Sequence, residues 1–175
     1  MKSRMILTVT IVLIVSVATC ARLAGGAPPI HDITTDTNDP PLFVDVLPLR
    51  AGARNSADYG GSRVAALQRA AYPDIVPVDL AIAPTAAFAK ARAAANAMGW
   101  ALVAADSSSG RIEATATTRV FRFKDDVVIR IRPRDGGSRL DIRSVSRIGG
   151  GDLGKNASRI REFILRLRES PAHAP

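Results

Sequence analysis

Apolar and polar residues alternate along much of the second half of the chain. Val127, Ile129 and Ile131 fall on one side of a segment whose other side carries Arg130 and Arg132. A period of two is typical of a β-strand with one buried face, because successive side chains of a strand point to opposite faces. The alternation and the turn residues between its segments predict four consecutive strands, at residues 100–105, 111–121, 126–132 and 139–148. The turns are short, so these strands should form an antiparallel meander.

Two other segments repeat their apolar residues at the spacing of a helix. The first, residues 84–98, opens on Pro84 and is followed by Gly99, and both residue types are typical of helix ends. The second, residues 152–169, begins at Asp152, a residue type that favours helix starts. The apolar stripe of this second helix comprises Leu153, Ala157, Ile160, Ile164 and Leu167.

One more strand is predicted at residues 76–82, which makes the order strand, helix, four strands, helix. That order predicts an α+β domain over residues 73–170, with a tail at 171–175. Its antiparallel sheet of about five strands would carry two helices on one face and leave the other face open to solvent.

The solvent face of this sheet would be rich in arginine and threonine, with Glu113 and Asp141 among them. Cross-strand ion pairs are one interpretation, and a platform that binds an anion is the other. Residues 149–156 nearly match a phosphate-binding loop, but Asn156 stands where that loop needs Ser or Thr, so nucleotide hydrolysis is not expected. The helix that starts there could still hold an anion with its free N–H groups. The candidate ligand-binding residues are therefore Arg130, Arg132, Arg143, Arg147, Asp152, Lys155 and Asn156.

Residues 1–27 have the pattern of an export signal or membrane anchor. Lys2 and Arg4 precede a 15-residue run without formal charge, from Met5 to Thr19, and Cys20 follows it. This run is typical of a secretory signal and short for a spanning helix, which needs about 20 apolar residues. A lipoprotein acylated at Cys20, an uncleaved anchor and an ordinary cleaved signal remain three alternatives. Each would place the domain outside the cytoplasm, and the first two would attach it to a membrane.

Residues 28–72 are rich in proline and turn formers, which predicts an extended segment that serves as a stalk. A short helix capped by Ser62 is expected within it. Asp32, Asp36 and Asp39 supply carboxylates, but their spacing does not match a calcium-binding loop, and turns made by Asp side chains explain them more simply. The sequence therefore predicts no metal site and no cofactor.

Composition and charge narrow the partners. The 175-residue chain has a formal net charge of +8 and a single cysteine, which excludes an intramolecular disulfide and a Cys-based structural zinc site. A basic domain commonly binds nucleic acid, but an exported location argues against that partner. The expected partners are the membrane through the N-terminus and an anionic lipid, a cell-wall polymer or another envelope protein.

Few residues are available for catalysis. Of the two histidines, His173 lies in the C-terminal tail, which leaves His31. His31, Asp32 and Asp126 would form the acid–base set of an uncommon hydrolase or lyase if residues 28–72 folded back onto the domain. Asp125 precedes Asp126, so the two should point to opposite faces of their strand. A non-catalytic binding or structural module is the interpretation that this inventory favours.

Several ordered motifs resemble one bacterial family. They are Pro28–Asp36, Tyr72–Ile75, Glu113–Thr118, Phe123–Arg130 and the stretch from Ser144–Arg147 through Asp152–Asn156. Together, over about residues 28–168, they resemble the family catalogued as domain of unknown function 1499 (DUF1499). The resemblance implies an envelope protein with an N-terminal membrane segment, because members often have one, and it implies no particular reaction. The sequence thus predicts an exported, membrane-attached protein of the cell envelope or periplasm.

Overall fold

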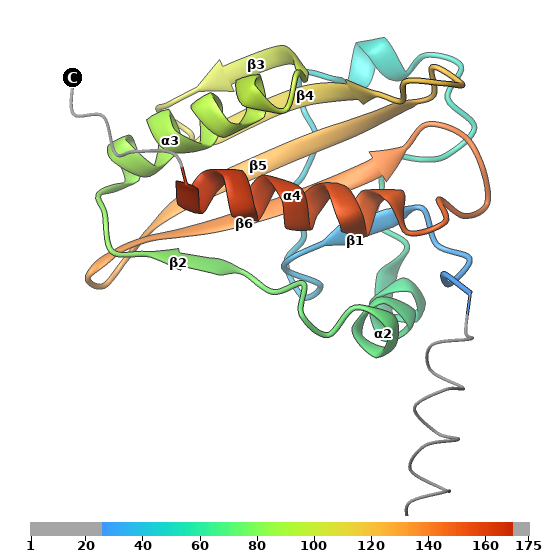
Figure 1. Ribbon diagram of the computed structural model, residues 1–175, viewed down its shortest axis with the longest axis horizontal. Coiled ribbons are helices and arrows are strands. Elements are labelled where there is room, and N and C mark those ends of the chain that lie inside the picture. Colours follow the sequence, from blue (N-terminus) through green and yellow to red (C-terminus); the bar gives the residue numbers. More distant parts are fainter. Residues whose placement is uncertain (1–25, 170–175) are drawn as a thin grey trace, which may run out of the picture.

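Six strands form one antiparallel sheet in the computed structural model, which describes residues 26–169 (Figure 1). The strands are β1 (Asp32–Thr34), β2 (Val78–Leu80), β3 (Ala101–Asp106), β4 (Arg111–Thr117), β5 (Lys124–Arg134) and β6 (Gly137–Ser146). Their spatial order is β1-β6-β5-β4-β3, and β2 also pairs with β6. The predicted α+β class and the meander of the last four strands are confirmed. The additional strand is β1, which lies in the segment predicted to be a stalk.

The β5–β6 hairpin and β2 approach each other closely at one end of the sheet. Leu80 pairs with Ser138, and a Cβ atom on the neighbouring Gly137 would overlap the carbonyl oxygen of Leu80. Only glycine leaves room for that contact, so the Gly-Gly turn that predicts the hairpin also admits β2 to the edge of β6.

Two of the three α-helices in the described part of the chain cover one face of the sheet (Figure 1). They are α3 (Pro84–Ala97) and α4 (Lys155–Glu169), and they follow the predicted segments closely. The third, α2 (Gly61–Ala71), lies beside β1, where the Gln68 side chain exchanges two hydrogen bonds with the backbone of Thr34, at 3.0 and 2.6 Å. Gln68 thereby occupies the free edge of β1 much as another strand would.

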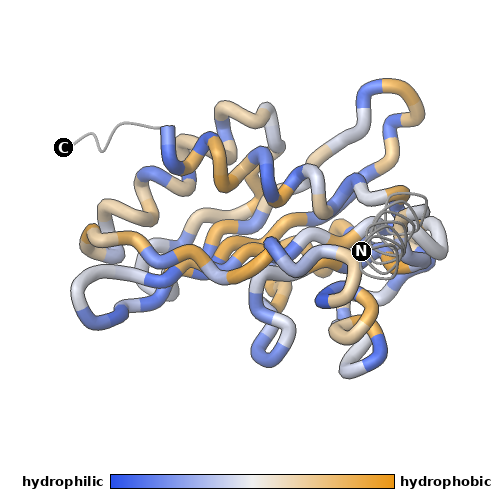
Figure 2. The backbone as a smooth tube through the Cα atoms, turned by 60° about the horizontal axis from the view of Figure 1, so that its bottom comes forward, coloured by the Kyte–Doolittle hydropathy of each residue, from blue (hydrophilic) through white to orange (hydrophobic). Residues whose placement is uncertain are grey.

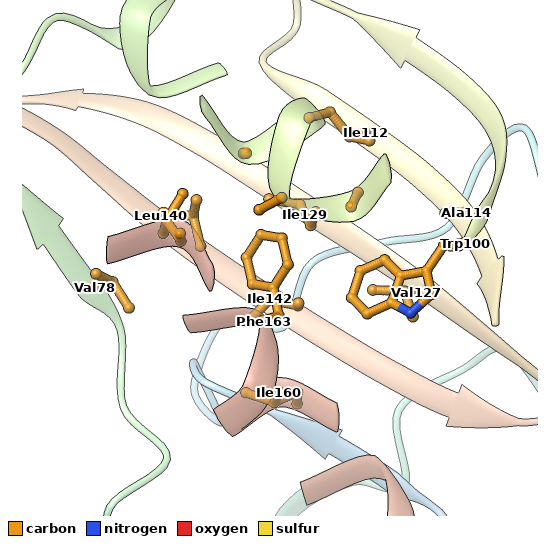
Figure 3. Packing of buried hydrophobic residues seen from close by; sticks show 14 of the residues in the cluster. Val78, Trp100, Ile112, Ala114, Val127, Ile129, Leu140, Ile142, Ile160 and Phe163 are labelled. Carbon is orange, nitrogen blue, oxygen red and sulfur yellow. The ribbon is translucent and has the colours of Figure 1, made fainter. Parts of the chain in front are cut away.

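The main hydrophobic core lies between the helices and the sheet (Figure 3). Trp100 stacks on Phe163 of α4 with ring centroids 5.5 Å apart, against β-strand residues such as Val127 and Ile142. The prediction that Leu153 belongs to the buried stripe of the last helix is wrong. Leu153 precedes α4 and is 89% exposed, and Phe163 is the buried member instead.

Residues 35–60 cover the second face of the sheet, so the prediction of an open face and of a stalk is wrong. Phe43 and Val46 of this segment pack on Val128 of β5 and Val145 of β6, which form a second hydrophobic cluster. The segment includes a short 3₁₀ helix, η1 (Leu47–Arg50). We call residues 35–60 the extension.

In residues 26–169, none of the helices is both long and apolar enough to cross a membrane. The predicted anchor, Cys20 and His173 lie outside the described residues.

Candidate functional site

Four buried acidic side chains hold the extension against the sheet. Asp32, Glu113, Asp126 and Asp141 come from four different strands, and all point to the face that the extension covers. Residues two or four positions apart on a strand point to the same face of the sheet. Each of the four acids stands at such a spacing from another polar residue of its strand, so both side chains point to the same face. Each one bonds to basic side chains or backbone amides, which compensates the cost of burying its charge.

The pair between Asp32 and Arg143 lies deepest. Arg143 of β6 donates from Nε to Asp32 Oδ1 at 2.9 Å and from Nη2 to Oδ2 at 2.8 Å, and its side chain is fully buried. Its guanidinium lies over the rings of Phe43 and Tyr59, 5.1 and 5.5 Å from their centroids. Burial raises the pKa of the Asp32 carboxyl, and the hydrogen bonds from Arg143 oppose that rise.

Arg143 also bonds to the extension itself. Nη1 donates to the carbonyl of Pro41 at 3.1 Å, and Nη2 donates to that of Ala57 at 2.7 Å. Burial next to the Asp32 carboxylate raises the pKa of Tyr59 to about 12, so this phenol stays neutral. One guanidinium therefore joins β1, β6 and both ends of the extension.

Asp126 of β5 accepts four hydrogen bonds and is fully buried. Arg50 of η1 donates to Oδ2 at 2.5 Å, and Arg147 donates to Oδ2 at 2.9 Å and to Oδ1 at 2.8 Å. The fourth donor is the Thr115 hydroxyl, at 2.8 Å from Oδ1. The Asp126 hydrogen bond raises the pKa of Arg147, so this guanidinium stays charged.

Glu113 of β4 receives the backbone of the extension. The N–H groups of Val44 and Val46 donate to its two carboxylate oxygens, each at 2.8 Å. Arg111 Nε lies 3.1 Å from Glu113 Oε1. A fully buried carboxylate thus satisfies two amides that have no strand partner.

Arginines surround Asp141 of β6. Nitrogen atoms of Arg130, Arg132 and Arg139 lie 3.0, 3.2 and 3.1 Å from its oxygens. The same arginines reach the extension, with Arg139 2.6 Å from Asp36 and Arg132 2.8 Å from Asp39. Of the two interpretations of the arginine face, cross-strand ion pairs are what the structure contains, supplemented by carboxylates of the extension.

Most of the predicted ligand-binding residues bond to other groups of the protein. Arg130, Arg132, Arg143 and Arg147 all form internal ion pairs. The remaining candidates are at the start of α4. Asp152 accepts from the N–H groups of Gly154 and Asn156, at 2.9 and 2.6 Å, so its own carboxylate takes the position proposed for an anion.

Asn156 is fully buried and bonds inside the protein. Its side chain accepts from Ser144 Oγ at 2.7 Å and donates to Ser146 Oγ and the His31 carbonyl, each at 3.0 Å. Lys155, in contrast, is exposed and forms no ion pair within residues 26–169.

The hydrolase candidates do not assemble into a catalytic set. Asp32 and Asp126 both lie level with Val145, in a row across β1, β6 and β5, but arginines occupy both carboxylates. Nδ1 of His31 is buried and has no hydrogen-bond partner within the described chain. No carboxylate there orients the imidazole, as acid–base catalysis by His and Asp would require. Asp125 and Asp126 point to opposite faces of β5, as predicted, and Asp125 pairs with Arg159 on the helix face.

Metal binding has no support from clustered ligands. No group of three or more His, Cys, Asp or Glu residues that could hold a metal ion occurs between residues 26 and 169.

Sequence reasoning missed the loop between β4 and β5, residues 118–123. The predicted strand ran to Phe121, whereas β4 ends at Thr117. The loop and its edges carry Arg119, Arg122 and Lys124, which are exposed and form no ion pair in the described region. The run Arg-Val-Phe-Arg-Phe-Lys, which mixes bases with apolar residues and lacks strand alternation, is the signal that could have revealed it.

Free basic residues gather at the end of the sheet where this loop lies. We call this set the basic end, and its members are Arg54, Arg119, Arg122, Lys124 and Lys155. Backbone hydrogen bonds place their segments together. The Arg147 N–H donates to the Lys124 carbonyl at 3.0 Å, and the Arg54 N–H donates to the Arg147 carbonyl at 2.9 Å. In Figure 1 these loops occupy the right-hand end of the molecule, where the described chain also begins.

These features define an α+β domain whose N-terminal extension closes the second face of the sheet through buried ion pairs. The chain belongs to the family described as "Protein of unknown function (DUF1499)", whose model matches residues 32–167. The resemblance seen in the sequence is thereby confirmed. The match begins at Asp32, so it includes the extension that Asp32 helps to hold. A search of curated proteins finds no match.

Proposed function

We propose that this protein is a non-catalytic module of the cell envelope, tethered to a membrane by residues 1–27, whose basic end binds an anionic envelope surface. The observation that carries the proposal is the basic end itself. Its five cationic side chains are exposed and lack ion pairs within residues 26–169, whereas the sheet-face arginines are neutralised by acids of the protein. Free cations on one end attract an anionic surface.

The entry point of the chain supports the same orientation. Backbone hydrogen bonds join the Ser146 N–H to the His31 carbonyl at 3.0 Å and the Asp152 N–H to the Ile30 carbonyl at 3.2 Å, next to the turn that carries Arg147. A tether formed by residues 1–27 would therefore hold the basic end, rather than the opposite end, near the membrane. Tethering raises the local concentration of the surface that the basic end would bind.

Co-sedimentation with vesicles tests the proposal. Every described helix and strand and both hydrophobic clusters are built from residues 26–169, so a chain of residues 26–175 contains the whole described fold. This chain should pellet with vesicles that contain phosphatidylglycerol and not with phosphatidylcholine vesicles, and added salt should release it. Purified cell-wall sacculi form a separate arm. Failure to bind any anionic surface at low salt would refute the proposal.

A triple variant with a matched control sharpens the test. Replacing Arg119, Arg122 and Lys124 with Gln should weaken binding to anionic vesicles by on the order of 100-fold, since each base near such a surface contributes ~1 kcal/mol. The control replaces Lys90, Arg92 and Arg168, which likewise form no ion pair with the described residues but lie on α3 and α4. It removes the same charge and should retain most of the binding. Equal losses in both variants would point to net charge alone.

The form of the tether needs its own experiment. A Cys20→Ser chain that still incorporates labelled fatty acid would exclude acylation at Cys20. Fractionation of the full chain after extraction with alkaline carbonate would then distinguish an uncleaved anchor from a cleaved signal, because the extraction removes protein held only at the membrane surface and leaves an anchored chain in the membrane fraction.

A further inference from the structure

The β4–β5 loop exposes apolar side chains that the rest of the fold leaves uncovered. Val120 is 80% exposed, Phe121 72% and Phe123 46%. Figure 2 shows a loop with an apolar tip between hydrophilic segments projecting at the right-hand end of the molecule. Adjacent exposed apolar residues of this size typically mark an interaction surface rather than ordinary protein surface.

The loop has a defined conformation. The Thr118 N–H donates to the Phe123 carbonyl at 2.9 Å, and the Phe123 N–H donates to the Thr118 hydroxyl at 2.9 Å, so hydrogen bonds close its base. Arg122 has a φ of 56°, a left-handed conformation that is unfavourable for a residue with a side chain. This turn accompanies the stacking of Phe121 on Phe123, with ring centroids 5.5 Å apart.

A second loop of the same end repeats this arrangement. Leu153, just before α4, has a φ of 53° and is 89% exposed, and Ile148 is 41% exposed. Arg122 and Leu153 are the two non-glycine residues with positive φ in the part of the chain that the structure describes. Strained backbone of this kind is found preferentially at functional sites.

The opposite end of the sheet lacks these features. Its hairpins are Asp-Ser-Ser-Ser-Gly, residues 106–110, and Pro-Arg-Asp-Gly-Gly, residues 133–137. Neither carries a large apolar side chain. Of the three turns of the β3–β6 meander, the β4–β5 loop is therefore the one that exposes large apolar side chains.

We propose that the β4–β5 loop inserts into a lipid bilayer, with Val120, Phe121 and Phe123 at the acyl-chain boundary and Arg119, Arg122 and Lys124 at the headgroups. The inference rests on the proposed function, because it identifies the anionic surface as a membrane. Apolar side chains gain transfer free energy in the acyl region and gain little from a hydrated cell-wall polymer. Arginine and lysine can keep their charged groups at the headgroups while their stems lie deeper.

The position of the loop relative to the tether supports a bilayer as the partner. Lys124 begins β5, Arg147 directly follows β6 and His31 directly precedes β1. Backbone hydrogen bonds join Arg147 to Lys124 and its neighbour Ser146 to His31 at this end. Neighbouring strands are about 4.8 Å apart, so the loop base and the entering chain are separated by roughly 10 Å. A membrane that holds the uncharged run at residues 5–19 is thus within reach of the loop.

Tryptophan fluorescence in the full chain tests insertion. Phe121→Trp is made in the full-length protein, which is reconstituted into vesicles whose lipids carry bromine on the acyl chains. The expected result is a blue-shifted emission that the brominated lipids quench. Ser107→Trp, in the opposite hairpin, is the control and should not be quenched. The native Trp100 is buried against Phe163, so its emission supplies a constant background.

Replacing Val120 and Phe123 with Ser in the Phe121→Trp chain should reduce quenching to the level of the Ser107→Trp control. Both side chains are exposed, so circular dichroism should show an unchanged fold. The inference would be overturned if the introduced loop tryptophan emitted at the wavelength of a water-exposed residue and was not quenched while the protein was bound to vesicles.

The outcome separates insertion from the proposed function. Anionic binding of residues 26–175 without quenching of the Phe121→Trp chain would leave the proposed function standing and overturn insertion. Equal quenching in phosphatidylcholine and phosphatidylglycerol vesicles would support insertion and remove the need for an anionic surface. Binding to sacculi and not to vesicles would identify a cell-wall polymer and overturn insertion.

Discussion

Replacing Arg143 with Met should release the extension from the sheet. Methionine keeps an apolar stem between the rings of Phe43 and Tyr59 but removes both hydrogen bonds to Asp32. The Asp32 carboxylate then remains buried without its partner. The carbonyls of Pro41 and Ala57 also lose their donor.

The expected loss is large relative to the stability of the domain. Removing one partner of a buried ion pair costs about 3–5 kcal/mol. A stability of ~0.05–0.15 kcal/mol per residue gives about 7–20 kcal/mol for a domain of this size, so the variant should remain folded but clearly destabilised. Asp32→Asn together with Arg143→Met should cost less than the sum of the two single changes, because the double variant buries no unpaired charge.

Urea denaturation of residues 26–175 measures the global effect, and hydrogen exchange measures the local one. The amides of Val44 and Val46 report whether the extension has opened, since both donate to Glu113. Their exchange should accelerate by on the order of 100- to 1000-fold if the extension opens separately from the sheet. Arg134→Met is the matched control, because Arg134 pairs with Asp79 at the surface and such pairs contribute about 0–1 kcal/mol. A loss below about 1 kcal/mol for Arg143→Met, with unchanged exchange at Val44 and Val46, would refute the role assigned to this pair.

Three further predictions concern other attachments. Glu113→Gln should lower the free energy of unfolding by about 1–3 kcal/mol, because the amide offers only one oxygen to the N–H groups of Val44 and Val46. An unchanged midpoint of urea denaturation would contradict the docking of the extension on Glu113. Asp152→Ala should cost about 1 kcal/mol by removing the cap of α4. Asp152→Asn should recover part of that loss, because its single side-chain oxygen can accept from one of the two N–H groups; equal losses would argue against capping. The hydrogen bond from Arg132 lowers the pKa of Asp39 in the folded state, so this carboxylate stabilises the fold above its unfolded pKa of about 3.9 and loses that effect as pH falls. Asp39→Asn should therefore flatten the decline of stability between about pH 5 and pH 2 relative to the native chain, and an identical acid profile would contradict the assignment.

The meander and its two faces could be predicted because their signals are local. In β5 and β6 each side chain is assigned to a face by its neighbours two residues away, and the turns that join β3 to β4 and β5 to β6 contain glycine. Helix α3 is similarly bounded by Pro84 and Gly99. None of these elements requires knowledge of a distant partner.

The β1 strand and the extension could not be predicted in this way. All three residues of β1 are buried, so Asp32–Thr34 shows no alternation of burial, and a three-residue strand has little propensity of its own. Its pairing with β6 joins residues more than one hundred positions apart, as in Asp32 with Val145. The proline and Asp residues that suggested a stalk are compatible with a docked segment because its amides bond to side chains such as Glu113 rather than to a strand.

The candidate site shows the same division. The sequence by itself determined that arginines line one sheet face, and that bases and phenylalanines follow one another at residues 119–124. Only the tertiary structure decided that the face arginines are neutralised by Asp32, Asp126 and Asp141, while the loop bases form no ion pair with any part of the chain between residues 26 and 169. The physical reason is that a charge pattern records which side chains are present on a face, whereas the partner of each charge depends on which distant segment folds over it.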